Sequence, residues 1–291
     1  MDELIKAGKI ATEVVDYAKS IIKPGKKLKD IAEEIDSKII ELGAKPAFPV
    51  NLSINEIAAH STPSWDDETK AFGLLKVDIG VHLDGFCADT AFSVDLDNDE
   101  ENKKLIESAE FALKKAVEII NKNIELEKIG EIIEKSVKEK GFTPIVNLSG
   151  HNIEEYELHA GITIPNFKNG NKNLLGEGTF AIEPFATNGL GKVRDGKPSG
   201  IFHLQREGNV RDAFSREVLY FIADEYRTLP FCSRWIYNQF GTRGLLALRH
   251  IKQAGLIYEY PQLVESGKGK VAQAEHTVLI NKDDKIITTE L

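Results

Sequence analysis

Cysteine is nearly absent from this sequence, with only two in 291 residues. Cys87 and Cys232 lie far apart, and neither belongs to a CxxC motif. Paired thiols are typical of disulfide frameworks and of zinc–thiolate sites, so the sequence argues against both. It also lacks the apolar run of about 18 residues that a membrane-spanning helix needs. The acids in MDELIKAGKI stand where a signal peptide has basic residues. We therefore expect a soluble, cytoplasmic protein with no membrane partner.

Basic residues are also in deficit, since 37 lysines and arginines face 46 acids and the net charge is -9. This balance argues against a general DNA or membrane binder, because both partners are polyanionic. All eight arginines lie between Arg194 and Arg249, in a stretch with helical patterns such as REVLYFIADEYRTL. We interpret 192–255 as an inserted helical subdomain, and 1–191 with 256–291 as the main catalytic domain. No glycine-rich phosphate loop and no GxSxG motif is present.

The pattern of apolar residues predicts the main elements of the fold. Apolar residues at helical spacing predict helices from the start to Pro24, then over 28–42, 102–122 and 126–140. Strand patterns cover 74–83, 86–94, 179–185 and 271–280. Helices that alternate with mostly hairpin-connected strands are typical of an α+β domain with an antiparallel sheet.

Two aspartates in KVDIGVHLDGFCADTAF form the first candidate site. Asp84-Gly85 is a strong signal for a two-residue hairpin loop. Counting back from that loop places Asp89 opposite Gly80, with Asp78 on the same face and open space at the glycine. A three-residue loop would reverse this parity. Two carboxylates on one buried face repel each other unless a cation lies between them. We expect metal binding here, with a pair of solvated acids as the alternative.

Further metal-ligand candidates are scattered along the chain. LSGHNIEEYELHAG contains His151 and His159, while Glu183 and Glu275 lie in the apolar runs TFAIEPFAT and KVAQAEHTVLI. An ionised carboxylate in such a run is costly unless it is paired or bound to a metal. His276 lies on the opposite strand face and is expected to be structural. Four carboxylates with one imidazole suit divalent Mn, Fe or Co, and also Zn. The set predicts a dinuclear hydrolase.

At these residues the sequence resembles the methionine aminopeptidases, and specifically their type II branch. The resemblance covers almost the whole chain, because five segments match in order and spacing: AFPVNLSINEIAAHSTP, VDIGVHLDGFCADTAF, SGHNIEEYELHAG, AIEPFAT and AQAEHTVLI. It implies the pita-bread α+β fold, with two pseudo-twofold halves around the metals. It also implies an inserted, winged-helix-like helical subdomain late in the chain, where the arginines lie.

The resemblance also implies a role for each metal-ligand candidate. Two divalent ions (Co, Mn, Fe or Zn) are expected, one chelated by Asp78 and the other by His151 and Glu183. Asp89 and Glu275 are expected to bridge both ions. A bridging hydroxide then attacks the carbonyl of the N-terminal methionine, and Glu183 accepts a proton.

Three further residues are implied on the substrate side. His159 is expected to stabilise the tetrahedral intermediate or to contact the peptide, and His60 in AAHSTP is the second substrate-side histidine. Tyr260 in YEYPQL resembles a tyrosine that lines the type II site. For the apolar methionine pocket, the candidates are Phe48, Ile57 and the residues near Phe202–His203.

Two alternative functions stay open at this point. Proline-specific dipeptidases and aminopeptidase P share the five ligands, but they normally carry a large domain before the catalytic part, and only 77 residues precede Asp78 here. Other relatives lose the ligands and bind nucleic acid or ribosomes without catalysis, whereas here all five ligand positions are filled. The expected partners are the N-terminal methionine of peptides and nascent proteins, and transiently the ribosome. The protein is expected to be a monomer.

Overall fold

The computed structural model describes residues 2–282 and 284–290. The predicted α+β class and antiparallel pairing are confirmed, because every strand pair in these ranges is antiparallel. Within the same ranges no helix is long and apolar enough to cross a membrane. Both cysteines are buried as free thiols, as their spacing predicts.

The four helices predicted outside the insert are all present. They are α1 (Asp2–Ile21), α2 (Leu28–Glu41), α3 (Glu100–Ile119) and α4 (Leu126–Glu139). Helix α3 begins two residues earlier than expected, because the Asp99 carboxylate accepts a hydrogen bond from the backbone N–H of Glu101 and caps the helix. Gly43 and Gly141 follow the ends of α2 and α4 with positive φ, a backbone conformation that favours glycine.

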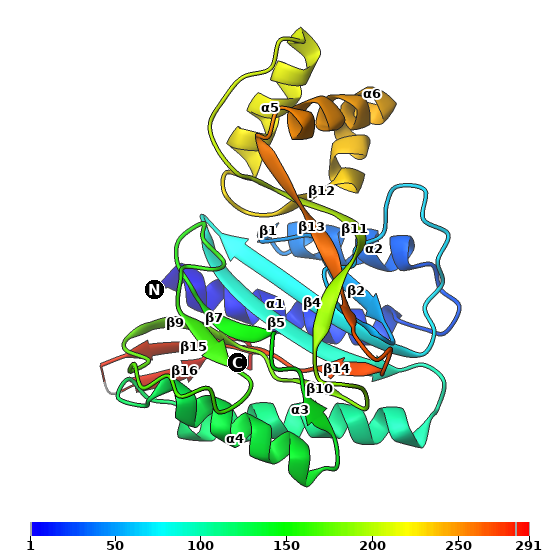
Figure 1. Ribbon diagram of the computed structural model, residues 1–291. Coiled ribbons are helices and arrows are strands. Elements are labelled where there is room, and N and C mark those ends of the chain that lie inside the picture. Colours follow the sequence, from blue (N-terminus) through cyan, green and yellow to red (C-terminus); the bar gives the residue numbers. More distant parts are fainter. Residues whose placement is uncertain (1, 283, 291) are drawn as a thin grey trace.

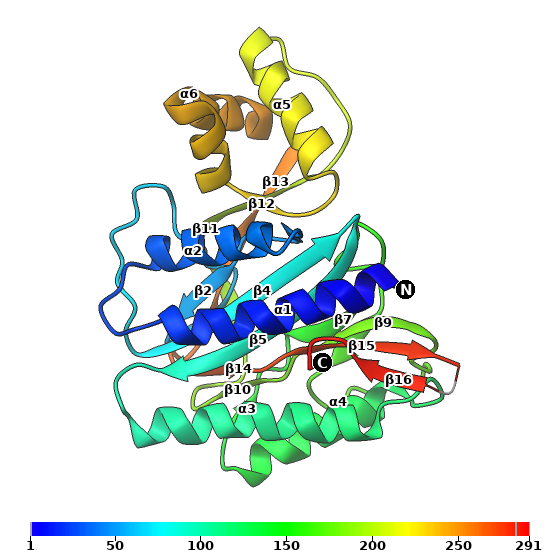
Figure 2. The ribbon, with the colours of Figure 1, turned by 180° about the vertical axis from the view of Figure 1, so that it is seen from behind.

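The first half of the molecule packs α1 and α2 against one face of a sheet. Its strands are β1 (Lys45–Pro46), β2 (Asn51–Ile54), β4 (Leu74–Leu83) and β5 (Phe86–Asp95). Figure 2, which views the molecule from behind, shows α1 lying across β4 and β5 in the foreground. The face of β4 that carries Val77 and Ile79 buries itself against the helices. The opposite face of β4 therefore turns toward the centre of the molecule.

The second half repeats this plan, with α3 and α4 covering a five-stranded and a three-stranded sheet. One has the order β16-β15-β9-β7-β8 and the other β14-β10-β6. Their strands are β6 (Thr143–Pro144), β7 (Ser149–Ile153), β8 (Thr163–Pro165), β9 (Gly178–Ile182), β10 (Phe185–Thr187), β14 (Val271–Gln273), β15 (His276–Asn281) and β16 (Asp284–Ile287). A second hydrophobic core lies beneath α3 and α4. Two helix-backed halves that meet at their sheets make up the pita-bread fold.

Two predicted strands are each interrupted at a glutamate, which corrects the expectation of continuous strands over 179–185 and 271–280. The first strand breaks at Glu183-Pro184, between β9 and β10, and the second at Ala274-Glu275, between β14 and β15. Proline has no N–H for the ladder. At each break the chain passes from the five-stranded sheet to the three-stranded sheet or back.

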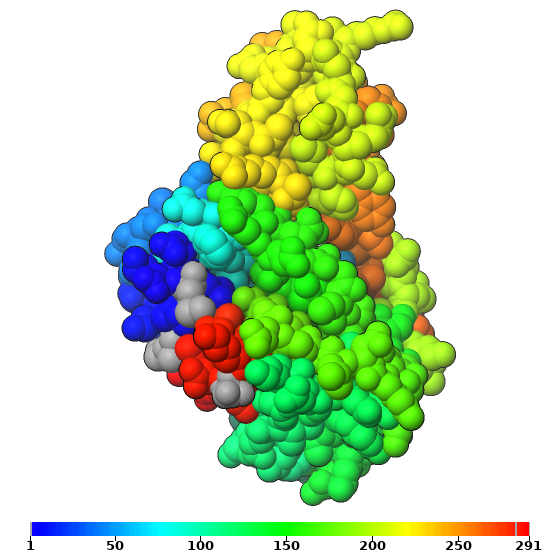
Figure 3. Space-filling model, turned by 90° about the vertical axis from the view of Figure 1, so that its left-hand side faces the viewer, coloured from blue at the N-terminus to red at the C-terminus, as the bar shows by residue number. Residues whose placement is uncertain are grey.

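The remaining elements form a fourth sheet, in the order β12-β11-β13-β3, and two helices at one end of the molecule (Figure 1). They are β3 (Ile57–Ala59), β11 (Val193–Leu204), α5 (Ala213–Glu225), β12 (Phe231–Cys232), α6 (Ser233–Gln253) and β13 (Ile257–Glu265). Figures 1 and 3 show α5 and α6 standing apart from the two halves. The range 192–255, predicted to be helical, therefore also contains β11 and β12. A separate hydrophobic core joins Phe202, Ile236 and Ile257. We propose on this basis that 192–255 is an inserted subdomain.

Candidate active site

A cavity of about 220 Å³ lies where the two halves and the insert meet. Eight candidate residues from six separate segments line it: His60, Asp78, Asp89, His151, His159, Glu183, Tyr260 and Glu275. Among the described residues that line this cavity there is no lysine or arginine. The fold thus brings all the site candidates together, with acids and neutral rings only.

The hairpin places the two aspartates as its loop predicts. Gly80 pairs with Asp89 across β4 and β5, so Asp78 and Asp89 share the central face. One oxygen of each carboxylate, Oδ1, is buried without a hydrogen-bond partner. The space at Gly80 is not open, however, because a Cβ there would lie 2.3 Å from the ring of Phe48. That ring fills the gap beside the aspartates.

The strand breaks bring the two glutamates to the same cavity. Ala91 pairs with Asp78 on one side of β5 and forms an isolated bridge to Glu275 on the other. The backbone N–H of Glu275 donates to the carbonyl of Ala91 at 2.9 Å. Glu183 occupies the corresponding break between β9 and β10. Each glutamate thus lies at a strand break, and its side chain lines the same cavity as the aspartates.

His151 completes the cluster from the middle of β7. Its Nε2 lies 3.5 Å from Glu183 Oε1 and 3.7 Å from Asp89 Oδ2. Ligand atoms of Asp89, His151 and Glu275 all lie within 4.8 Å of one another. Gln273, which the sequence reasoning missed, donates from Nε2 to Asp78 Oδ2 at 3.4 Å and to Glu275 Oε2 at 3.2 Å. Its position two residues before Glu275, on the same strand face, was the available signal.

Burial and mutual repulsion dominate the electrostatics of the cluster. Burial raises the pKa of Asp78 to about 7. Burial and the charge of Asp89 or Asp78 raise the pKa values of Asp89, Glu183 and Glu275 well above those of ordinary carboxyl groups. Burial lowers the pKa of His151 to about 3, so its imidazole is neutral, the form that binds metals. Orphaned carboxylate oxygens around a neutral imidazole fit a divalent cation, which would relieve their repulsion.

The substrate-side candidates form a row of neutral rings beside the cluster. The ring of His159 lies 4.3 Å from that of His151, and the ring of His60 lies 5.1 Å from that of Tyr260. His60 has a φ of 57°, a strained backbone for a histidine, and its Nδ1 is buried without a partner. Burial lowers the pKa of His60 to about 4 and also lowers that of His159.

Apolar side chains form the rest of the wall. Of the methionine-pocket candidates, Phe48 lines the cavity, whereas Ile57, Phe202 and His203 do not. Phe202 is part of the core of the insert, and His203 packs its ring on Tyr260 at 5.0 Å. Residues that the sequence reasoning missed supply the apolar wall instead: Ala59, Leu148, Leu158, Phe185, Ile201, Pro230 and Leu263. No motif marks these residues.

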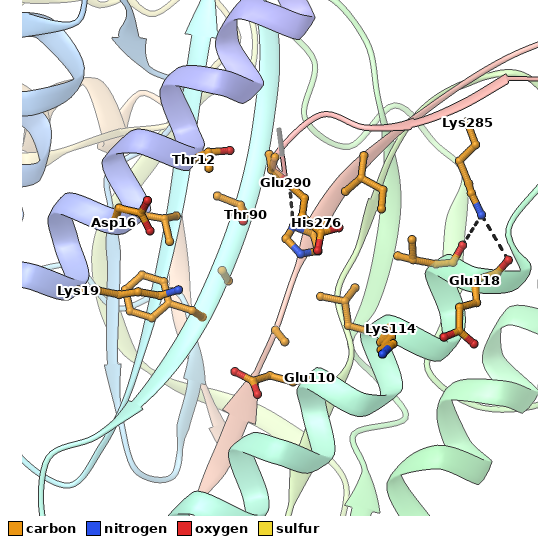
Figure 4. Close-up of a pocket in the computed structure, with 18 residues that line it drawn as sticks. Thr12, Asp16, Lys19, Thr90, Glu110, Lys114, Glu118, His276, Lys285 and Glu290 are labelled. Atoms are coloured by element: carbon orange, nitrogen blue, oxygen red, sulfur yellow. Dashed lines mark hydrogen bonds between the residues drawn. The ribbon is translucent and has the colours of Figure 1, made fainter.

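A larger cavity of about 760 Å³ lies on the helical side, between α1 and α3. Figure 4 shows His276 there, beside Thr90 and opposite Glu110. The Nδ1 of His276 is 2.9 Å from the hydroxyl of Thr289. The expectation that His276 lies on the face opposite to Glu275 is therefore confirmed. This cavity mixes lysines with acids and has no cluster like the one around His151.

The comparison with known families agrees with this geometry. The profile of metallopeptidase family M24 matches residues 2–282. The chain therefore belongs to metallopeptidase family M24. Its relatives include methionine aminopeptidases from Pyrococcus abyssi, 49% identical over 100% of this chain and 99% of that protein, and from Thermococcus onnurineus, 50% identical over 99% and 100%. Within the family it groups with these methionine aminopeptidases, and its activity is the removal of N-terminal methionine.

Solved structures show the same fold at lower identity. A thermophilic Arx1 matches with a TM-score of 0.86 at 15% identity, over 99% of this chain and 90% of that one. The methionine aminopeptidase of Thermotoga maritima matches with a TM-score of 0.72 at 23% identity, over 99% and 95%. The prolidase of Pyrococcus furiosus matches with a TM-score of 0.64 at 18% identity, but this chain covers only 63% of that one.

Proposed function

We propose that the five clustered residues hold two divalent metal ions, Co, Mn, Fe or Zn, with which the enzyme hydrolyses the bond after an N-terminal methionine. The supporting observation is the convergence of four carboxylates and one imidazole on one cavity, where ligand atoms of Asp89, His151 and Glu275 all lie within 4.8 Å of one another. In this proposal Asp78 would help to hold one ion and His151 and Glu183 the other, with Asp89 and Glu275 as ligands that the two ions would share. Divalent ions in such a site activate water near neutral pH and polarise the scissile carbonyl.

The protein's own groups bind the peptide and move its protons. Glu183 is the proposed proton acceptor, because its carboxylate lines the cavity next to His151 and Asp89. His159 lies at the edge of the cluster, where it donates a hydrogen bond to the substrate carbonyl as charge develops. His60 and Tyr260, whose rings pack on each other in the same cavity, orient the peptide. The apolar wall around Phe48 and Leu158 accepts the methionine side chain.

The cellular setting is part of the same proposal. Nascent chains carry the N-terminal methionine, so we place the enzyme in the cytoplasm, as a monomer that contacts ribosomes transiently. The range 192–255 supports this contact, because it holds eleven basic and six acidic residues in a chain whose net charge is -9. Contact with ribosomal RNA predicts binding that weakens steeply with salt. Salt-independent binding, or none, would remove the ribosome from the proposal.

Metal reconstitution with substrate competition tests the function. The chelated protein is refilled with Co, Mn, Fe or Zn and assayed on Met-Ala-Ser, Ala-Pro and an Xaa-Pro tripeptide. We expect methionine release only when metal is present, with bound metal approaching two ions per chain. Preferred cleavage of the proline substrates would favour a proline-specific peptidase. Ribosome binding without any cleavage would favour a non-catalytic relative.

His159 provides a separate test of the proposed roles. We expect His159→Ala to lower kcat by about 100-fold, the usual contribution of one positioned proton donor, without changing metal content. Steady-state kinetics and metal analysis measure the two quantities. An unchanged kcat would remove His159 from the reaction.

A further inference from the structure

The insert reaches the active-site cavity through two apolar residues. Pro230 and Ile201 both line the cavity. Ile201 pairs with Cys232 across β11 and β12, and Pro230 directly precedes β12. Pro230 and Ile201 therefore form one wall, and the placement of β12 sets the position of that wall.

A buried ion pair anchors the chain just after β12 to the first half of the molecule. Arg234 Nη1 donates to Asp36 Oδ2 at 2.8 Å, and Arg234 Nε donates to the carbonyl of Pro63 at 3.3 Å. The indole N–H of Trp235 donates to the same Asp36 oxygen at 2.7 Å. The side chains of Arg234 and Asp36 are only 1% and 10% exposed. Three hydrogen bonds thus fix the start of α6 against α2 and the loop after β3.

The neighbouring side chains transmit this placement to the cavity. Leu229, one residue before Pro230, packs in the same cluster as Phe48 and Leu158, which also line the cavity. The ring of Tyr226 stacks between Phe231 and Trp235, at 5.2 Å and 5.6 Å. A shift of β12 would therefore move Pro230 relative to Phe48.

The burial of the pair points to positioning rather than to stability. A buried ion pair gains little net free energy over apolar residues of similar size, because both charges lose their water. The planar guanidinium, however, holds its partner in a defined orientation. A second ion pair across this junction, Lys45 with Glu225 at 2.8 Å, is exposed to solvent and contributes little.

We propose that Asp36 and Arg234 are positioning residues for substrate binding. Together they hold the wall of Pro230 and Ile201 at the separation from Phe48 that fits a methionine side chain. This inference rests on the proposed function of the cavity, but it involves none of the metal ligands. It predicts a change in KM and in side-chain selectivity, with chemistry and metal binding intact.

Three variants of the full-length, metal-loaded enzyme test the pair: Asp36→Asn, Arg234→Met and the double variant Asp36→Leu/Arg234→Met. We expect each to raise KM for Met-Ala-Ser about tenfold with kcat within about twofold, since small misplacements of a binding wall weaken substrate binding. Cleavage of Leu-Ala-Ser relative to Met-Ala-Ser is expected to rise. Metal content stays at the wild-type value. The matched control Glu225→Gln removes the exposed pair and leaves KM unchanged.

The double variant separates positioning from stability. Apolar replacement of both charges is expected to restore Tm toward the wild-type value, because no buried charge is left unpaired. KM stays high if the pair acts by positioning, and the proposal is overturned if KM recovers together with Tm. If Asp36→Asn does not fold, the double variant alone decides the question.

Glu275→Gln, assayed in parallel, distinguishes a failure of the positioning role from a failure of the proposed metal site. Loss of activity in Glu275→Gln together with a wild-type KM in the pair variants rejects only the positioning role. Full activity in Glu275→Gln rejects the proposed metal site itself.

Discussion

At the scale of single residues, the active site is defined by four acidic side chains with no lysine or arginine beside them among the described residues of the cavity. Asp89 and Glu275 are buried, and Asp78 and Glu183 are partly buried. Such a group of acids is stable only if the acids take up protons or bind cations. Protonation and metal binding therefore compete for the same oxygens, and this competition makes the site testable.

Glu275 is the residue whose neutralisation is most informative. The change Glu275→Gln keeps the shape of the side chain but removes one of the charges proposed to contact both ions. We expect the hydrolysis of Met-Ala-Ser to fall by about 1,000-fold or more, because water activation depends on the metal. Circular dichroism is expected to show an intact fold, and metal analysis a reduced metal content. Asp89→Asn is the matched second variant, and full activity in either would contradict a shared dinuclear site.

The raised pKa of Asp78 makes the stability of the metal-free protein depend on pH. Its folded-state pKa is about 7 against an ordinary 3.8. In the metal-free protein its contribution to stability is therefore full below pH 3.8 and is lost as the pH rises through about 7. Metal-free Asp78→Asn is expected to melt several degrees above metal-free wild type at pH 8, and the difference is expected to shrink toward pH 5. Melting curves in chelator measure this, and a difference independent of pH would contradict the raised pKa.

At the scale of elements, the β4–β5 hairpin determines which side chains share the central face. Its two-residue loop sets the pairing of Gly80 with Asp89. The ring of Phe48, from the segment between β1 and β2, lies against Gly80. The absence of a side chain at residue 80 thus lets an aromatic wall approach the acids.

Gly80→Ala tests this packing. A Cβ at 2.3 Å from the Phe48 ring forces the ring to move. We expect KM for methionyl peptides to rise about tenfold, with metal content unchanged, because the ring lines the pocket and carries no ligand atom. The double variant Gly80→Ala/Phe48→Leu provides room for the methyl group and is expected to recover part of the loss. An unchanged KM in the single variant would show that the ring adapts without cost.

The elements also show what sequence patterns can and cannot reveal. The hairpin was predictable because its loop signal and its alternation are both local. Pro184 marks the break after Glu183, since proline has no N–H for the ladder. The break at Glu275 has no such signal, because the apolar pattern runs through it and the change of sheet is a tertiary event. The position of Pro230 and Ile201 at the cavity could not be predicted either. It depends on how the insert docks, and the contact that docks it, between Asp36 and Arg234, joins residues 198 apart in sequence.

At the scale of the whole molecule, the proposed ligands are divided between the two halves. Asp78 and Asp89 belong to the first half, and His151, Glu183 and Glu275 to the second. The direct backbone link between the halves at the site is short. Ala91 and Glu275 exchange hydrogen bonds of 2.9 and 3.4 Å, and the hydroxyl of Thr277 bonds to the backbone of Asp89. Ions held by both sets of ligands would therefore act as a cross-link.

We call the contact of β5 with β14 and β15, where the two halves meet, the seam. Metal removal should loosen this seam more than either half itself. Without the ions, repulsion among the four carboxylates acts directly across the contact of β5 with β14 and β15. We expect the amides of Ala91, Gln273 and Glu275 to exchange hydrogen at least about tenfold faster in chelator, because local opening becomes cheaper there. Amides of α5 and α6 serve as the internal control, since the core of the insert lies away from the ligands. Hydrogen exchange followed by mass spectrometry measures both regions. Equal acceleration in the seam and the insert would indicate general destabilisation, and the idea that the metals join the two halves would then be wrong.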